Sequence, residues 1–267
     1  MYRFFAISGI FLFVFASCKD NRTEYGFVRL KFQHQWNGEP IRIDDQTEYT
    51  NRAGNTLRFT KLQYIISDLM ILGADNIRVE HPGVYFIDRD TTVLILYQIP
   101  VGMYNSIGFT FGLDERKNIT GLFPNLGPPM AWPVGMGGGY HHLMFDGHWA
   151  CDIIATSGSF RLHLGSLERI IRYDTIPHTG EIIPIWHRFH NNHFYVSLPR
   201  TFEVRANQIT TVPIIMDVEQ WMESPQIWDV SVMNPPGNTC TMSREKALDS
   251  LRINGEGARH GGRNVFR

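Results

Sequence analysis

The sequence predicts an all-β fold: an antiparallel β-sandwich, or a partly closed barrel, with long loops and a short C-terminal helix. Short segments typical of strands recur between turn signals, and only two short stretches have helical character. The chain has 267 residues, within the range of one large β domain, and no linker or repeat divides it. Hydrophobic residues make up 43% of the chain, enough for a sizeable core. We therefore expect one domain over residues 26–267.

The first strand shows the clearest pattern. Val28, Leu30 and Phe32 share one face with polar residues between them, which is the period of two expected of a half-buried strand. His34 continues the apolar face. A histidine in that position is more often a core residue than a metal ligand, and it needs a hydrogen-bond partner in either case. The dipeptide Asn37-Gly38 then indicates a turn.

The remaining chain predicts more strands, two helices and one long loop. Strands are expected at residues 57–72 (one or two strands), 85–88, 92–98, 104–112, 140–145, 159–164, 193–198 and 209–218. Residues 113–129 contain Gly, Pro and Asn throughout and indicate a loop. Helices are expected at 218–223 and 243–254, the second with Ser243 as its N-cap and Gly255 as its stop.

A histidine-rich run, WHRFHNNH, precedes the strand expected at 193–198. His187, His190 and His193 are spaced by three, which on a helix would place them on one face. The turn signal Asn191-Asn192 and the strand that follows favour a surface loop instead.

The most unusual stretch is MAWPVGMGGGYHHLMFDGHW at residues 130–149, with FRLHLGS following at 160–166. It concentrates aromatic, imidazole and thioether side chains, namely Trp132, Trp149, His141, His142, His148, His163, Met130, Met136 and Met144. Imidazole and thioether suit copper and other borderline or soft metals. The three consecutive glycines at 137–139 permit a tight turn or a close approach of backbone. The stretch indicates a metal site on a β scaffold; the alternative is a Gly-rich turn leading into a core strand.

Charge and motifs exclude several functions. Lys and Arg number 25 against 26 Asp and Glu, so no electrostatic field for nucleic acid is expected. A nucleophile elbow, a P-loop, a dinucleotide fingerprint and an H-E-x-x-H motif are all missing from the sequence. We therefore expect a binding protein rather than an enzyme.

The N-terminus predicts a lipoprotein signal peptide over residues 1–17. Arg3 precedes an apolar run at 4–16 that is too short to span a bilayer. Small residues stand directly before Cys18, which resembles the bacterial lipobox, in which the cysteine becomes the lipidated N-terminus. Residues 18–25 would then be a lipidated tether. The chain would be anchored to the outer membrane of the cell envelope, on the periplasmic or the cell-surface side. An ordinary cleaved signal is the alternative.

Two cysteines remain, Cys151 and Cys240. An even pair in an oxidising compartment favours a disulfide between them. A free thiol or a metal thiolate stays open.

Five segments, in this order, resemble the MbnP-like family of copper-binding periplasmic and surface proteins, which includes lipoproteins of Bacteroidetes. They are FQHQWNGEPI (32–41), YTNRAGNTLRFTKLQYIISDLMIL (49–72), IPVGMYNSIGFTFGLDERKN (99–118), GYHHLMFDG (139–147) and FRLHLGS (160–166). Together they cover most of the chain that follows the signal peptide.

The resemblance implies an extracytoplasmic β-sandwich. The family's characterised members bind copper through two histidines and a tryptophan oxidised to kynurenine, and a di-haem peroxidase-like partner is associated with that oxidation. Carried onto this chain, the tryptophan is Trp132. The imidazoles are His34 and His163, which lie in matching segments, followed by His141. His141 and His142 stand where Ile and Phe are common in the family.

These observations favour a lipid-anchored copper-binding protein that captures, stores or delivers the metal. One alternative is a metal-free surface lipoprotein that binds a glycan or an envelope protein through exposed Trp186, Trp221 and Trp228. A further alternative is a metalloenzyme with three imidazoles and an open coordination position.

Overall fold

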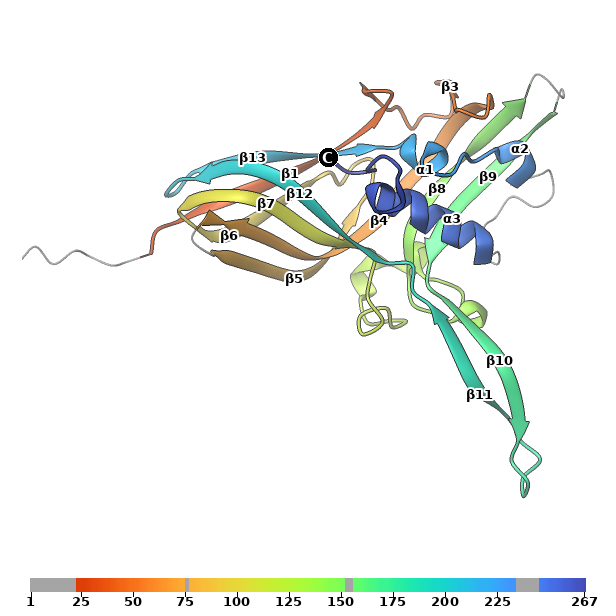
Figure 1. Cartoon of the computed structure of the whole chain (residues 1–267). Coiled ribbons are helices and arrows are strands. Elements are labelled where there is room, and N and C mark those ends of the chain that lie inside the picture. Colours follow the sequence, from red (N-terminus) through yellow and green to blue (C-terminus); the bar gives the residue numbers. More distant parts are fainter. Residues whose placement is uncertain (1–22, 75–76, 152–155, 234–244) are drawn as a thin grey trace, which may run out of the picture.

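The computed structural model describes residues 23–74, 77–151, 156–233 and 245–267 (Figure 1). A seven-stranded sheet contains β3 (Tyr49–Thr50), β4 (Thr56–Gly73), β5 (Arg78–Ile87), β7 (Gly102–Phe111), β8 (His141–Cys151), β9 (Thr156–Gly165) and β12 (Phe194–Val204). A four-stranded sheet contains β1 (Tyr25–Trp36), β2 (Glu39–Pro40), β6 (Val93–Pro100) and β13 (Ile209–Asp217). The two sheets and a C-terminal helix confirm the predicted β-sandwich.

The strands pair in an almost wholly antiparallel way. Among the described strands, only β1 and β13 run parallel. The segment expected to hold one or two strands at 57–72 is the single strand β4, whose register shifts near Asp68. β4 pairs with β3, β5, β7 and β8, so it organises the larger sheet.

Aromatic rings fill the space between the sheets. Phe32 of β1 contacts Tyr64 of β4 and Phe109 of β7, with ring centroids 6.4 Å apart in both pairs. Phe59 of β4 stacks on Phe145 of β8 at 4.7 Å. The predicted inward face of the first strand is confirmed, since Val28, Leu30 and Phe32 are buried.

A two-stranded hairpin, β10 (Leu167–Thr175) and β11 (Ile182–His190), extends away from the body of the molecule (Figure 1). The prediction of a surface loop for the WHRFHNNH run is wrong over its first part, because β11 continues to His190 and pairs with β10. Only Asn191, Asn192 and His193 lie between strands. The turn signal at the end of the run favoured a loop, whereas the strand β11 depends on pairing with β10, which lies earlier in the chain.

Short helices complete the C-terminal part: α1 (Gln220–Glu223), α2 (Val230–Met233) and α3 (Glu245–Glu256). Gly255 does not stop α3, because the helix ends one residue later. A Cβ at Gly255 would lie 2.6 Å from the ring of Phe194 and 2.7 Å from that of Trp221. This glycine therefore permits close packing of α3. The packing offsets the lower helix propensity of glycine, which costs about 1 kcal/mol relative to alanine.

Several predicted features lie outside the described residues: the signal peptide at 1–17, the lipidation site Cys18, the N-cap Ser243 and the cysteine Cys240. Cys151 is buried near the end of β8. The loop predicted at 113–129 contains two short 3-10 turns, η2 (Pro124–Leu126) and η3 (Pro128–Met130). A third, η4 (Val134–Met136), follows this loop, and η6 (Gly257–His260) follows α3. Within the described ranges, no helix has the length and apolarity to span a membrane.

The stacked pair of Phe59 and Phe145 provides a test of the core. Phe59→Ala should lower the free energy of unfolding by about 3–5 kcal/mol, because a buried ring leaves a cavity between β4 and β8. Chemical denaturation followed by tryptophan fluorescence measures this change. Ile182→Ala, at a side chain 67% exposed on β11, is the matched control and should change stability by less than about 0.5 kcal/mol. Equal losses in the two variants would contradict the contribution of this core contact.

Candidate metal centre

The Gly-rich loop folds back on the preceding loop. Gly138 and Gly139 have positive φ values of 69° and 84°, a conformation that glycine adopts without steric cost. A Cβ at Gly139 would lie 2.3 Å from the side-chain oxygen of Asn118. That oxygen accepts a hydrogen bond of 2.8 Å from the backbone N–H of Tyr140. The glycines thus permit the close approach that the sequence predicted.

This loop places Trp132 over the end of β9. The backbone N–H of Trp132 donates to the Gly139 carbonyl at 3.0 Å, and its indole Nε1 donates to the Met136 carbonyl at 3.2 Å. A Cβ at Gly165 would lie 2.4 Å from the indole ring. Gly165 therefore lets the fully buried Trp132 lie flat against the strand.

His141, the first residue of β8, lies between Trp132 and His163. Its ring centroid is 4.9 Å from each of the other two ring centroids. Its Nδ1 is 3.2 Å from the Met130 carbonyl. A carbonyl oxygen only accepts, so Nδ1 carries the proton and Nε2 holds the lone pair.

The lone pair on Nε2 of His141 is the functional feature of this ring. Nε2 is buried and has no hydrogen-bond partner. Burial, followed by the positive charge that His163 can carry, lowers the pKa of His141 to about 4. The ring is therefore neutral at neutral pH and is able to act as a metal ligand.

His163 is held by an acidic side chain of the neighbouring strand. Its Nε2 lies 2.7 Å from Oδ1 of Asp146, and Oδ2 of Asp146 lies 3.3 Å from Nζ of Lys61. Burial alone would raise the pKa of Asp146, but the hydrogen bond and charge of His163, together with Lys61, lower it. A carboxylate only accepts, so Nε2 donates and coordination by this ring would use Nδ1. A carboxylate of this kind orients a metal-binding imidazole.

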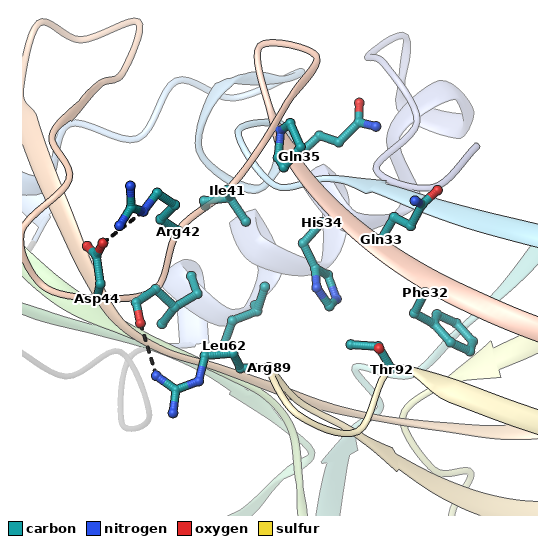
Figure 2. Close-up of a pocket in the computed structure, with 12 residues that line it drawn as sticks. Phe32, Gln33, His34, Gln35, Ile41, Arg42, Asp44, Leu62, Arg89 and Thr92 are labelled. Carbon is teal, nitrogen blue, oxygen red and sulfur yellow. Dashed lines mark hydrogen bonds and ion pairs between the residues drawn. The ribbon is translucent and has the colours of Figure 1, made fainter.

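The structure places His34 elsewhere. Its Nε2 lies 3.0 Å from the hydroxyl of Tyr64, and burial lowers its pKa to about 4. Figure 2 shows the ring beside a pocket of about 490 Å³, which Leu62 and Arg89 also line. Of the four residues predicted to bind metal, the structure brings together Trp132, His141 and His163. His34 lies apart from them, on β1 of the four-stranded sheet, and its partner is Tyr64 of β4.

Two residues at this end of β8 were not predicted as site residues. Asp146 could not be recognised, because its contact with His163 depends on the register between β8 and β9. His142 is fully buried, and neither of its ring nitrogens has a partner in hydrogen-bonding geometry. Burial, then the charge of His193, lowers the pKa of His142 to about 3, although the nearby Asn192 carbonyl opposes this shift.

The candidate metal ligands of the centre are two imidazoles. The Trp132 indole lies beside His141 with its Nε1–H donating to the Met136 carbonyl, and the Met130 backbone carbonyl contacts His141. Across the described parts of the chain, no three His, Cys, Asp or Glu side chains are arranged to hold a metal ion. Imidazole nitrogens are a ligand type that suits copper, whereas hard divalent cations prefer several oxygen ligands.

The fold and this centre define a class of protein: a two-sheet β protein that buries a tryptophan and two histidines where β8 and β9 meet. The MbnP family model matches residues 25–242, so the chain belongs to the MbnP family. The solved structure of MbnP from Methylosinus trichosporium is similar in fold, with a TM-score of 0.54 and 14% identity, covering 90% of this chain and 97% of that chain. No curated protein matches the chain. The resemblance expected from the sequence is confirmed.

The buried histidines make the metal-free protein sensitive to acid. The pKa of His142 falls from 6.5 to about 3 on folding, so protonation costs no stability above pH 6.5, and the stability of the fold is progressively lost as the pH falls from 6.5 toward 3. His142→Phe should make the free energy of unfolding fall less steeply in that range, by roughly 1.4 kcal/mol per pH unit. Denaturation at a series of pH values, with a chelator present, measures the slope. His178→Gln, at an exposed position, should leave the slope unchanged; the same slope in all three proteins would contradict the prediction.

Proposed function

We propose that this chain is an extracytoplasmic copper-binding protein that captures, stores or delivers the metal, and that it is not an enzyme. The observation that carries the proposal is the buried, partnerless Nε2 of His141 beside His163 and Trp132. A buried polar atom without a partner costs about 1–3 kcal/mol, and a metal ion would satisfy it. Bound copper would supply a soft, redox-active cation.

Each residue of the centre has a distinct role in this proposal. His141 would bind copper through Nε2 and His163 through Nδ1. Asp146 would fix the His163 ring and hold its proton on Nε2. Trp132 would close the centre from the loop side, and it is the residue that would become kynurenine. A di-haem peroxidase-like protein would be the partner for that oxidation.

The proposed location follows from the N-terminus. Cleavage before Cys18 and lipidation of that cysteine would anchor the chain to the outer membrane. The anchored protein would then bind copper in the cell envelope, the location that the family resemblance implies.

The metal-free alternative loses two of its three expected contact residues. Trp221 and Trp228 were expected at the surface, but both are fully buried. They pack in the core near the C-terminal helices and offer no platform for a glycan. The side chain of Trp186 lies outside the described part of the structure.

Metal analysis tests the copper centre directly. The soluble form, residues 19–267, purified after copper supplementation, should retain copper, and His163→Ala should lose the ion held with His141. His178→Ala is the matched control and should retain all bound copper. Peptide mass spectrometry would detect kynurenine at Trp132 as the gain of one oxygen and loss of one carbon. Equal copper contents in the His163 and His178 variants would overturn the proposal.

The role of Asp146 is tested by affinity. Asp146→Asn keeps the size of the side chain but removes the charge that orients His163, so Cu(I) affinity should fall roughly 10–100-fold. Competition with a chromophoric Cu(I) chelator measures this change. Asp90→Asn, at an 80% exposed side chain, should bind as the unmodified protein does. An unchanged affinity in Asp146→Asn would show that His163 binds without its carboxylate.

A further inference from the structure

A second pair of imidazoles lies next to the candidate metal centre. His142 has a fully buried side chain, and neither ring nitrogen has a partner in hydrogen-bonding geometry, although the Asn192 carbonyl is near enough to act on its pKa. Nearly all buried polar groups in folded proteins are hydrogen-bonded, so an imidazole unsatisfied at both nitrogens requires an explanation. A neutral imidazole has one donor and one acceptor nitrogen. A ligand or a water molecule is therefore expected at this ring.

The end of strand β7 brings His193 to the same place. The His142 ring lies against Gly112, where a Cβ would be 2.6 Å from its Nδ1. Gly112 follows Phe111, which pairs with Phe194, the residue directly after His193. The backbone of His193 therefore lies next to Gly112, against which the His142 ring packs, and His193 is near enough for its charge to lower the pKa of His142. Nδ1 of His193 is also buried and without a partner.

The surroundings favour a cation over an anion. Burial is the largest effect on His193 and lowers its pKa, while the negative charges of Asp114, Glu115 and Asp68 oppose that shift. Asp68 is paired with Lys117, so the two other carboxylates are the main source of negative potential. His193 is only half-buried, so this side of the pair reaches solvent, whereas His142 is fully buried.

We infer that His142 and His193 form a second copper site, specific for the cuprous ion. Two neutral nitrogen ligands suffice for Cu(I), which accepts low coordination numbers and carries one charge to be buried. Ions that require four or more ligands would need donors beyond these two rings, and the described side chains include no cluster of three or more His, Cys, Asp or Glu that could hold a metal. The alternative is a buried water bridging the two rings.

This second site is separate from the first and does not rest on it. The ring of His141 is directed at Trp132, His163 and the Met130 carbonyl. The neighbouring His142 lies against Gly112 instead. Each site can therefore be removed without touching the ligands of the other.

Anaerobic titration with Cu(I), buffered by a chromophoric chelator, tests the inference when combined with native mass spectrometry. The unmodified protein should bind two ions. His142→Phe should bind one ion, and His193→Gln should have a lower affinity for the ion that His142→Phe loses. His163→Ala should also bind one, and the combined His142→Phe, His163→Ala variant none. His178→Gln is the control and should bind two. Circular dichroism and the unfolding midpoint of each variant establish that it is folded.

The outcomes separate the two sites. One ion in the unmodified protein, kept in His142→Phe and lost in His163→Ala, overturns the second site and supports a bridging water. One ion lost in His142→Phe and kept in His163→Ala supports the second site and overturns the first. Should His142→Phe not fold, an unchanged Cu(I) affinity for both ions in the half-buried His193→Gln variant would overturn the inference.

Discussion

The pairing of β4 with β8 is the interaction on which the rest of the structure depends. β4 lies in the middle of the larger sheet, and Phe59 and Tyr64 on it join the aromatic core that holds the two sheets together. Its register with β8 sets where His141 and Asp146 lie, and the register of β8 with β9 then brings His163 to them. A shift of one residue in either pairing would turn these side chains to the other face. The register of the sheet thus positions His141, His163 and Asp146, and the Gly-rich loop positions Trp132 beside them.

Burying neutral histidines lowers the stability of the metal-free protein. Burial lowers the pKa values of His34, His141 and His142, but only His34 gains a side-chain partner, the Tyr64 hydroxyl. His141 and His142 keep unsatisfied nitrogens inside a core rich in packed aromatic rings. Natural proteins break local rules of this kind mainly at functional sites. The concentration of unsatisfied nitrogens at the start of β8 therefore indicates function more strongly than the histidine content of the sequence does.

Local patterns predicted much of the fold. The alternation around Val28 and Phe32 marked β1, and the Gly-rich turn before His141 was correctly predicted to permit close backbone approach. The hairpin of β10 and β11 was missed, because those strands pair only with each other and show no clean alternation. The parallel pairing of β1 with β13 was equally hidden, since its partners lie at opposite ends of the chain. A local residue pattern indicates that a strand is present, but it does not indicate which distant strand pairs with it.

The same distinction explains the candidate site. The family resemblance pointed to Trp132, His141, His163 and His34, and the density of copper-compatible side chains drew attention to the stretch that holds the first three. Asp146 and the Tyr64 partner of His34 were out of reach, because each contact joins residues 17 and 30 positions apart, respectively. His34 shows the consequence: a core residue was the commoner expectation on its apolar face, and the structure makes it half-buried with its Nε2 3.0 Å from the Tyr64 hydroxyl. A partner on one nitrogen, as at His34 and His163, still leaves the other nitrogen for a metal. What sets the candidate centre apart is that the His141 ring contacts both Trp132 and His163.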